Sequence, residues 1–259
     1  MSLTGIDHIV IMFPELDEAI RSYTRLGFTV VPGGEHPGGT HNALVAFTDG
    51  AYLELIAFKT PNPEHRWWTP AQAGGGLIDF CLATNDLAAD LAAFRRAGAQ
   101  MADPTRGARR WPDGYEVAWR LAVPEGSDRF QVPFLIEDIT PRTERVPAAT
   151  QHANGVSGVD TLSLAVRDLD HLRAVWSGIL GVPGRTVNPS PGEAHAGVRY
   201  AVGAHTLEFL SPTSAASPLA DRLATRGPSP HALALRAFAG MTETLDERAT
   251  GARIRLLRA

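Results

Sequence analysis

The sequence is poor in several features, and each shortage excludes a class of protein. It has a single cysteine, Cys81, in 259 residues, so neither an intramolecular disulfide nor a multi-thiolate metal site can form. No apolar run approaches the roughly 18 residues of a membrane-spanning helix, so we expect no membrane partner. With 24 basic and 28 acidic side chains the formal net charge is −4. That balance gives no basic surface for nucleic acid.

Common phosphate-binding and nucleophile motifs are also missing. No G-x-G-x-x-G or Walker-type loop follows an expected strand, and there is no G-x-S-x-G nucleophile elbow. The first residues, MSLTGIDHIVIMF, have no basic region before the apolar stretch, so we expect no export signal and a cytoplasmic location. Apolar residues make up 44% and charged residues 20%, as in ordinary globular proteins. We therefore expect a globular protein whose partner is a small molecule.

The strongest positive feature is an internal duplication. Residues 5–17 (GIDHIVIMFPELD) align without a gap with residues 158–170 (GVDTLSLAVRDLD). Later in each copy, Leu53-Glu54-Leu55 recurs as Leu207-Glu208-Phe209. A weaker copy begins at Gly76, and a truncated one begins near Pro230. Repeats of this kind indicate a fold that is built from one supersecondary unit used several times.

Hydrophobic periodicity gives the unit as β-α-β-β-β. In the first copy, residues 6–12 read as a strand, residues 15–26 as an amphipathic helix, and Asp49-Gly50 as a hairpin turn. We therefore expect an α+β fold in which tandem units pair into two curved-sheet domains, the last unit being truncated. The expected domains are residues 1–140 (units 1–60 and 76–140), a Pro- and Thr-containing linker at 141–155, and residues 156–259 (units 156–212 and 228–259).

The motifs within these units resemble the vicinal oxygen chelate superfamily, which contains glyoxalase I, extradiol dioxygenases, methylmalonyl-CoA epimerase and the bleomycin- and fosfomycin-resistance proteins. The resemblance is greatest to the glyoxalase-like subgroup. It covers the first 140 residues well, and the C-terminal half matches through its duplicated unit. The matching motifs are Gly5-Ile6-Asp7-His8, Gly27-Phe28, His36-Pro37, Gly39-Thr40-His41-Asn42, Tyr52-Leu53-Glu54-Leu55, Arg110-Trp111-Pro112-Asp113-Gly114 and Pro133-Phe134-Leu135-Ile136.

The resemblance implies that His8 and Glu54 meet in a concave pocket as the catalytic residues. Strand alternation agrees, because it places His8 on the opposite face of the strand from Ile9 and Ile11. Aligning the first two units puts Asp79 opposite His8 and Phe134 opposite Glu54. The implied metal ligands are therefore His8, Glu54 and Asp79, holding one divalent Zn, Mn, Ni or Fe. Because Phe134 cannot bind metal, a metal-free His8–Glu54 pair that acts as acid and base stays open.

A second group of residues is expected to bind substrate. His41 and Asn42 follow a glycine-rich loop and can form a polar rim, although Asn and Thr side chains in such loops also bond their own backbone. Arg110, Trp111 and Trp119 suit a flat or anionic ligand through stacking and paired hydrogen bonds. The alternative for the tryptophans is a purely structural position over the core.

These features predict an enzyme of glyoxalase-like type that acts on a small oxygenated metabolite by moving a proton next to a carbonyl group, as isomerases and lyases do. The alternative is a binding protein that sequesters a hydrophobic or planar compound, as resistance relatives do. Extradiol ring cleavage ranks third, because it requires two histidines and a carboxylate. Four units in one chain can complete a pocket, so we expect a monomer or a homodimer.

Overall fold

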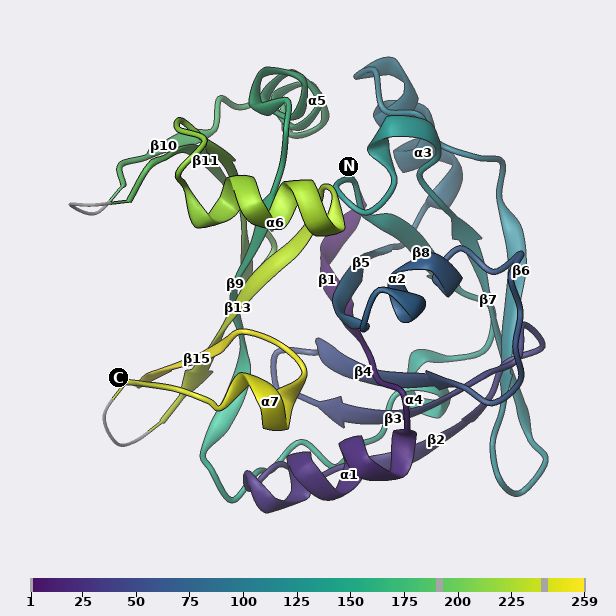
Figure 1. Cartoon of the computed structure of the whole chain (residues 1–259). Coiled ribbons are helices and arrows are strands. Elements are labelled where there is room, and N and C mark those ends of the chain that lie inside the picture. Colours follow the sequence, from purple (N-terminus) through teal and green to yellow (C-terminus); the bar gives the residue numbers. More distant parts are fainter. Residues whose placement is uncertain (1, 190–192, 239–241, 259) are drawn as a thin grey trace.

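The strands of the computed structural model, which describes residues 2–189, 193–238 and 242–258, form two curved sheets (Figure 1). The first sheet closes into a barrel of order β1-β4-β3-β2-β6-β7-β8-β5. Its strands are β1 (Leu3–Met12), β2 (Val31–Glu35), β3 (Thr40–Ala46), β4 (Tyr52–Phe58), β5 (Gly76–Thr84), β6 (Thr105–Arg110), β7 (Glu116–Ala122) and β8 (Phe134–Asp138).

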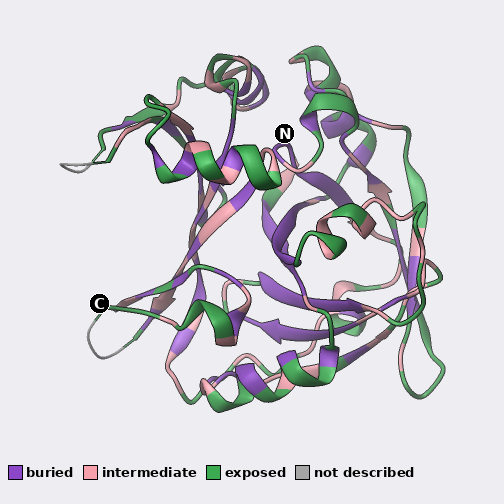
Figure 2. Ribbon diagram, in the orientation of Figure 1, coloured by how far each residue is buried: buried purple, intermediate pink, exposed green. Residues whose placement is uncertain are grey.

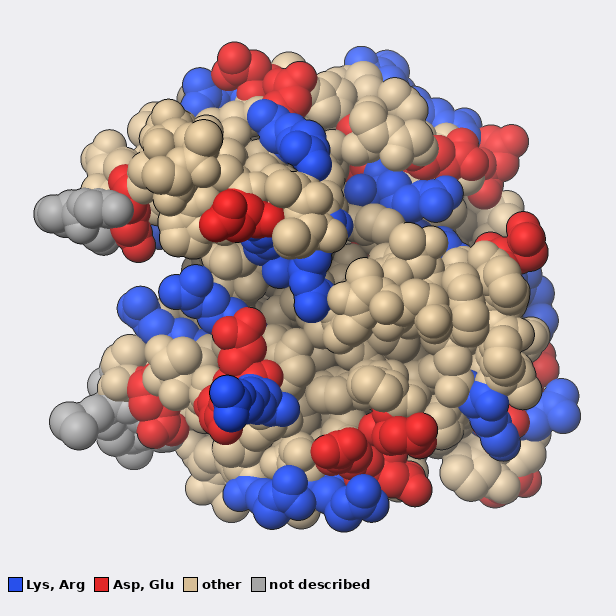
Figure 3. Space-filling model, viewed as in Figure 1, with Lys and Arg blue, Asp and Glu red and all other residues tan. Residues whose placement is uncertain are grey.

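The second sheet has the order β10-β11-β12-β9-β13-β15-β14 and does not close. Its strands are β9 (Val156–Ala165), β10 (Arg185–Val187), β11 (His195–Val202), β12 (His205–Pro212), β13 (Ser229–Ala237), β14 (Glu243–Thr244) and β15 (Ile254–Arg258). Its concave face holds an open hollow of about 650 Å³. In the space-filling view a deep notch opens on the left, the side on which the second sheet lies (Figure 3).

Seven α-helices lie outside the sheets in the described part of the chain. They are α1 (Leu16–Arg25), α2 (Trp68–Gln72), α3 (Leu87–Arg96), α4 (Arg142–Arg145), α5 (Leu169–Leu180), α6 (Pro218–Arg226) and α7 (Glu247–Thr250). Three of them start at aspartates that cap the helix: Asp86 accepts from Ala89 N, Asp168 from His171 N and Asp246 from Arg248 N. None of the described helices has the length and apolar composition that crossing a membrane would require.

The α+β fold with repeated units is confirmed. Strand β1 runs parallel to β4, with His8 opposite Tyr52, and β9 runs parallel to β12, with Thr161 opposite Thr206. The segment 141–155, which composition suggested as a linker, contains α4 and packs onto the barrel. Its Arg145 is 1% exposed, and the ring of His152 lies between Thr29 N and Ala46 O.

Strands β1, β4 and β5 are buried along most of their length (Figure 2), and strand alternation divides the barrel residues between two apolar layers. Ile9, Ile11, Leu53 and Leu55 face outward into a core that continues through the second sheet. The alternate positions face into the barrel and form a second apolar cluster, which includes Val10, Met12, Ile56, Val117, Trp119, Phe134 and Ile136. The candidate site lies among this inner set.

Candidate functional site

The barrel interior contains a cavity of about 250 Å³. That volume equals about eight waters at roughly 30 Å³ each, so the cavity suits a small ligand. Its wall combines aromatic rings with ionisable groups that contact them, such as His8 on Tyr52 and His36 beside Trp119. Its lining includes His8, His36, Glu54, Arg109, Trp119 and Arg145.

The structure brings His8 and Glu54 together in this cavity. His8 Nε2 lies 3.5 Å from Glu54 Oε2, and both side chains are 6% exposed. Asn42 Nδ2 donates to the other carboxylate oxygen, Glu54 Oε1, at 2.6 Å. Asn42 Oδ1 in turn accepts from Gly34 N at 3.0 Å, which fixes the amide orientation. The glutamate therefore has one oxygen held by the protein and one directed at the histidine.

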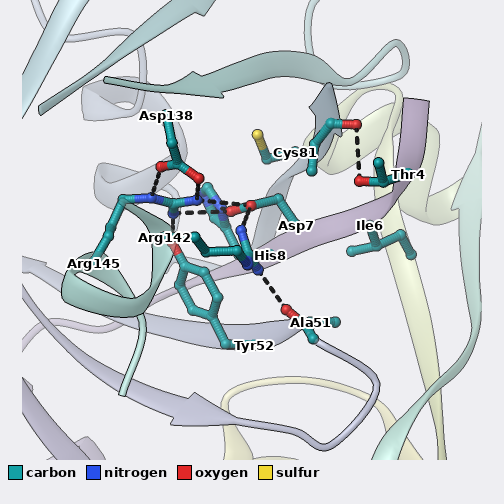
Figure 4. A network of polar contacts seen from close by, with 12 residues as sticks. Thr4, Ile6, Asp7, His8, Ala51, Tyr52, Cys81, Asp138, Arg142 and Arg145 are labelled. Atoms are coloured by element: carbon teal, nitrogen blue, oxygen red, sulfur yellow. Dashed lines mark hydrogen bonds and ion pairs between the residues drawn. The ribbon is translucent and has the colours of Figure 1, made fainter. Parts of the chain in front are cut away.

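Asp7 holds the other side of the imidazole (Figure 4). Its Oδ1 lies 2.6 Å from His8 Nδ1, so a proton on Nδ1 donates to Asp7 and Nε2 faces Glu54. The Asp7 carboxylate also accepts from Arg145 Nη2 at 2.9 Å and from Arg142. Burial alone would raise the pKa of Asp7, but Arg145, the His8 hydrogen bond and Arg142 hold it well below its usual range. Asp7 is thus a fixed anion that orients His8.

Two further histidines line the cavity as neutral rings. Burial lowers the pKa of His36 to about 4, although the neighbouring Glu54 acts in the opposite direction. Its Nδ1 lies 3.0 Å from Thr40 Oγ1, and its Nε2 lies 3.8 Å from Glu54 Oε1. Burial also lowers the pKa of His65, with Arg66 adding to the effect. His65 Nδ1 accepts from Trp67 N at 3.2 Å.

Asp79, expected from the sequence as the third metal ligand, is bound to other groups. Its Oδ2 pairs with Arg66 Nη2 at 2.8 Å and accepts from Trp67 Nε1 at 2.8 Å. Its Oδ1 accepts from Phe80 N at 3.0 Å. Burial raises the pKa of Asp79, with Arg66 opposing it. Because both oxygens already have donors, the carboxylate is not available as a ligand beside His8 and Glu54.

A different trio has its ligand atoms within 4.8 Å of one another in the described part of the chain: Asp7, His8 and Cys81. It does not fit a divalent metal. Both Asp7 oxygens accept from guanidinium groups, whose charge repels a cation. Burial, followed by the charge of Asp7, raises the pKa of the Cys81 thiol well above its usual value, whereas metal binding requires a thiolate.

His36 adds a second histidine beside His8 and Glu54, which is the donor type of many iron sites. Ligands on one metal with bonds of about 2.1 Å lie no more than about 4.2 Å apart. These three are not among the described groups whose ligand atoms all fall within 4.8 Å. Asn42 also holds one Glu54 oxygen. The three side chains therefore do not form a preformed metal centre.

The residues expected to bind substrate fall on both sides of the barrel wall. Trp119 lines the cavity, and Trp111 lies beneath the Arg109 guanidinium, 4.3 Å from it. His41 and Arg110 do not line the cavity. The Arg110 side chain is 67% exposed and pairs with Glu116 outside the barrel at 3.6 Å. The physical reason is strand alternation, which turns Arg110 outward and its neighbour Arg109 inward.

His36, Arg109 and Arg145 were not among the residues expected to form the site, although all three line the cavity. For Arg109 a signal existed: it has the same parity on its strand as Gly107, which pairs with Trp119 on β7. His36 stood inside a quoted motif. Arg145 gave no signal, because it lies in a segment without periodicity.

The second sheet has the equivalent glutamate but no histidine at the position that corresponds to His8. Glu208, the counterpart of Glu54, accepts from Ser163 Oγ at 2.8 Å and pairs with Arg199. Thr161 stands at the histidine position and bonds Asp160. Among the described residues, the second sheet therefore has no counterpart of the His8–Glu54 contact.

Comparisons with known proteins agree with this architecture. A family model described as a glyoxalase-like domain matches residues 6–180. A hypothetical protein from Staphylococcus aureus is similar over 100% of both chains, with a TM-score of 0.73 and 18% identity. A mutant of 4-hydroxymandelate synthase from Streptomyces coelicolor is similar over 92% of this chain and 72% of its own, with a TM-score of 0.64 and 16% identity. No curated protein matches. At such identities the two structures share the fold alone.

Proposed function

Because the chain belongs to the glyoxalase-like domain family of the vicinal oxygen chelate superfamily, we propose that it is an enzyme that moves a proton next to a carbonyl group of a small oxygenated metabolite. The substrate lies in the barrel cavity, and His8 and Glu54 are the catalytic residues. The reaction is of the isomerase or lyase type.

The observation that carries this proposal is the line from Asp7 through His8 to Glu54. The distances are 2.6 Å from Asp7 Oδ1 to His8 Nδ1 and 3.5 Å from His8 Nε2 to Glu54 Oε2. With Nδ1–H donating to Asp7, His8 Nε2 faces Glu54 Oε2 as a second proton-accepting atom. A proton that one of the two atoms takes from carbon can be returned by either, which is what general acid–base catalysis requires.

The proposed proton path conserves all atoms. The C–H bond next to the substrate carbonyl breaks, its electron pair forms the enolate, and its proton goes to the Glu54–His8 pair. The same pair then returns a proton to carbon, which isomerises the substrate, or to a departing oxygen, which makes the step an elimination. Asp7 acts as a positioning residue throughout, because it holds the imidazole and does not reach the cavity itself.

The test is exchange of substrate carbon-bound protons in deuterated water, followed by proton NMR over a panel of small hydroxy and oxo compounds. We expect Glu54→Gln to slow exchange by about 100-fold or more, since it keeps the shape and removes the base. The matched control is Glu208→Gln, which alters the equivalent glutamate of the second sheet and should leave the rate unchanged. Equal exchange rates in Glu54→Gln and wild-type protein would contradict the proposal.

Metal dependence is examined in the same assay. We expect exchange to continue in protein treated with chelator, because the residues around His8 and Glu54 do not form a ready ligand set. If exchange appears only after Zn, Mn, Ni or Fe(II) is added, the metal-free form of the proposal is wrong. Metal that is retained by wild-type protein but lost from His8→Ala would also contradict the metal-free form of the proposal.

One observation favours a second function, the sequestration of a planar compound. The cavity wall includes Trp67, Trp119 and Phe134, which offer flat apolar surface. Tight binding of an aromatic compound without any proton exchange would support this second function over the enzyme.

A further inference from the structure

Three arginines line the barrel cavity, and two of them have carboxylate partners. Arg145 pairs with Asp7 at 2.9 Å, and Arg106 pairs with Glu116 at 2.9 Å. Arg109 differs. Within residues 2–189, 193–238 and 242–258, no carboxylate lies within 4.0 Å of its guanidinium. The cavity therefore contains one arginine whose charge the protein does not pair directly.

Arg109 is nevertheless buried and held in place by neutral groups. It is 2% exposed, and its guanidinium lies 4.3 Å from the centre of the Trp111 ring. Its Nη2 donates to Arg145 O at 2.6 Å, whereas its buried Nε has no hydrogen-bond partner in the described structure. Burying a charge and an N–H group without partners costs free energy. Such a cost is removed when a ligand supplies the missing anion.

Resting on the function proposed above, we propose that Arg109 binds a carboxylate group of the substrate, so that the substrate is a small carboxylic acid with an oxygenated carbon directed at His8 and Glu54. The Trp111 ring and Arg145 O fix the plane of the guanidinium. The remaining N–H groups can then bind a carboxylate in the paired geometry that arginine favours.

The surroundings agree with this substrate class. His36 and His65 are neutral donors and so do not compete with Arg109 for the anion. The cavity of about 250 Å³ limits the ligand to a short chain or a single ring beyond the carboxylate. The aromatic wall at Trp119 and Phe134 suits the apolar end of such an acid.

The experiment compares acids with their neutral esters. Binding of lactate, pyruvate and phenyllactate, and of their methyl esters, is measured by isothermal titration calorimetry. We expect at least one acid to bind wild-type protein about tenfold or more tightly than its ester, as charged hydrogen bonds require. Arg109→Gln should abolish that preference, and Arg109→Lys should keep part of it. The control is Arg120→Gln, an outward arginine on β7 that is 54% exposed and pairs with Glu137.

Several outcomes would overturn the inference. They are equal affinity of acid and ester for wild-type protein, a preference that survives in Arg109→Gln, and no acid binding at millimolar concentration. Binding of inorganic phosphate in place of the acids would also overturn it. The comparison in wild-type protein requires no variant, so it holds even if Arg109→Gln fails to fold, which far-UV circular dichroism would reveal.

Failure of this inference is distinguishable from failure of the proposed function. Acids that bind through Arg109 without exchanging their carbon-bound protons would support the binding site and contradict the enzyme. If esters exchange their carbon-bound protons as fast as acids do, in wild-type protein and in Arg109→Gln alike, the enzyme is supported and the carboxylate site at Arg109 is contradicted.

Discussion

At the scale of single residues, the barrel depends on one fully buried carboxylate. Asp7 is 0% exposed and is bonded by His8, Arg142 and Arg145. Arg145, itself 1% exposed, also bonds Tyr52 Oη at 2.9 Å. A network of this kind stabilises the fold only while its buried members keep their partners, because Asp7 and Arg145 lie in a region that water does not reach.

Replacing Asp7 by asparagine should therefore lower the free energy of unfolding by about 3–5 kcal/mol, since it leaves Arg145 buried without its main anion. Urea denaturation followed by fluorescence measures the change. The control is Asp138→Asn, whose carboxylate is the second partner of Arg145 but is 24% exposed and should matter less. If both variants unfold like wild-type protein, the network is not a source of stability.

A second residue should make stability depend on pH. Burial lowers the pKa of His231 to about 4 from its ordinary 6.5, with Arg222 and Arg253 adding to the effect. Between pH 6.5 and 4 the unfolded chain binds a proton that the folded chain does not. The free energy of unfolding must then fall as the pH falls through this window, by up to about 1.4 kcal/mol per unit.

His231→Gln should reduce that slope between pH 4 and 6.5 and leave the slope above pH 7 unchanged. Chemical denaturation at a series of pH values measures both. The same slope in variant and wild-type protein would mean that His231 takes up its proton in the folded state.

At the scale of elements, the pairing of β6 with β7 shapes the cavity wall. Gly107 lies opposite Trp119, and the indole occupies the space that a Cβ at residue 107 would fill. The glycine is required here by close approach rather than by its backbone angles. The alternation of the same strand turns Arg109 inward and Arg110 outward.

Gly107→Ala should displace the Trp119 ring, lower the free energy of unfolding by about 1–3 kcal/mol and weaken ligand binding. Denaturation and calorimetry measure the two effects. Adding Trp119→Leu should restore part of the stability, because the shorter side chain leaves room for the new methyl group. Additive losses in the double variant would show that the two residues do not clash.

At the scale of the whole molecule, the two sheets are joined by polar contacts as well as by a continuous core. Asp49, in the β3–β4 turn, accepts from Val159 N at 2.7 Å and Arg236 Nη2 at 2.8 Å, and lies 3.2 Å from His205 Nε2. Burial would raise the pKa of Asp49, but the hydrogen bond from His205 and those from the backbone N–H groups of Ala51 and Val159 lower it. One turn of the barrel thus holds three points of the second sheet.

Asp49→Ala should lower the free energy of unfolding by about 2–4 kcal/mol and separate the melting of the two sheets, since their joint loses an anion that is only 11% exposed. Scanning calorimetry distinguishes one transition from two. The control is Glu35→Gln, which removes an exposed pair with Lys59 and should leave melting unchanged. A single transition at the wild-type temperature would mean that the apolar core alone holds the two sheets together and that Asp49 does not contribute.

Periodicity predicted the unit, its repetition and the side of each strand on which His8 and Glu54 lie, while the resemblance to the superfamily implied that this side faces the pocket. It did not determine what those side chains would meet. Asp79 has the right parity but pairs with Arg66, which comes from the connection after β4. Arg109 rather than Arg110 lines the cavity, because the order in which β6 joins β2 and β7 sets its inner face.

Only the tertiary structure brought Arg145 into the barrel. This residue comes from a short helix in a segment without periodicity, and its guanidinium reaches Asp7 across 138 residues of sequence. The hydrophobic periodicity of one strand or helix determines which side of that element each residue occupies, because it depends only on residues of the same element. Charge partners are decided when the closed barrel buries groups from distant elements together and each charge must find its counter-ion away from water.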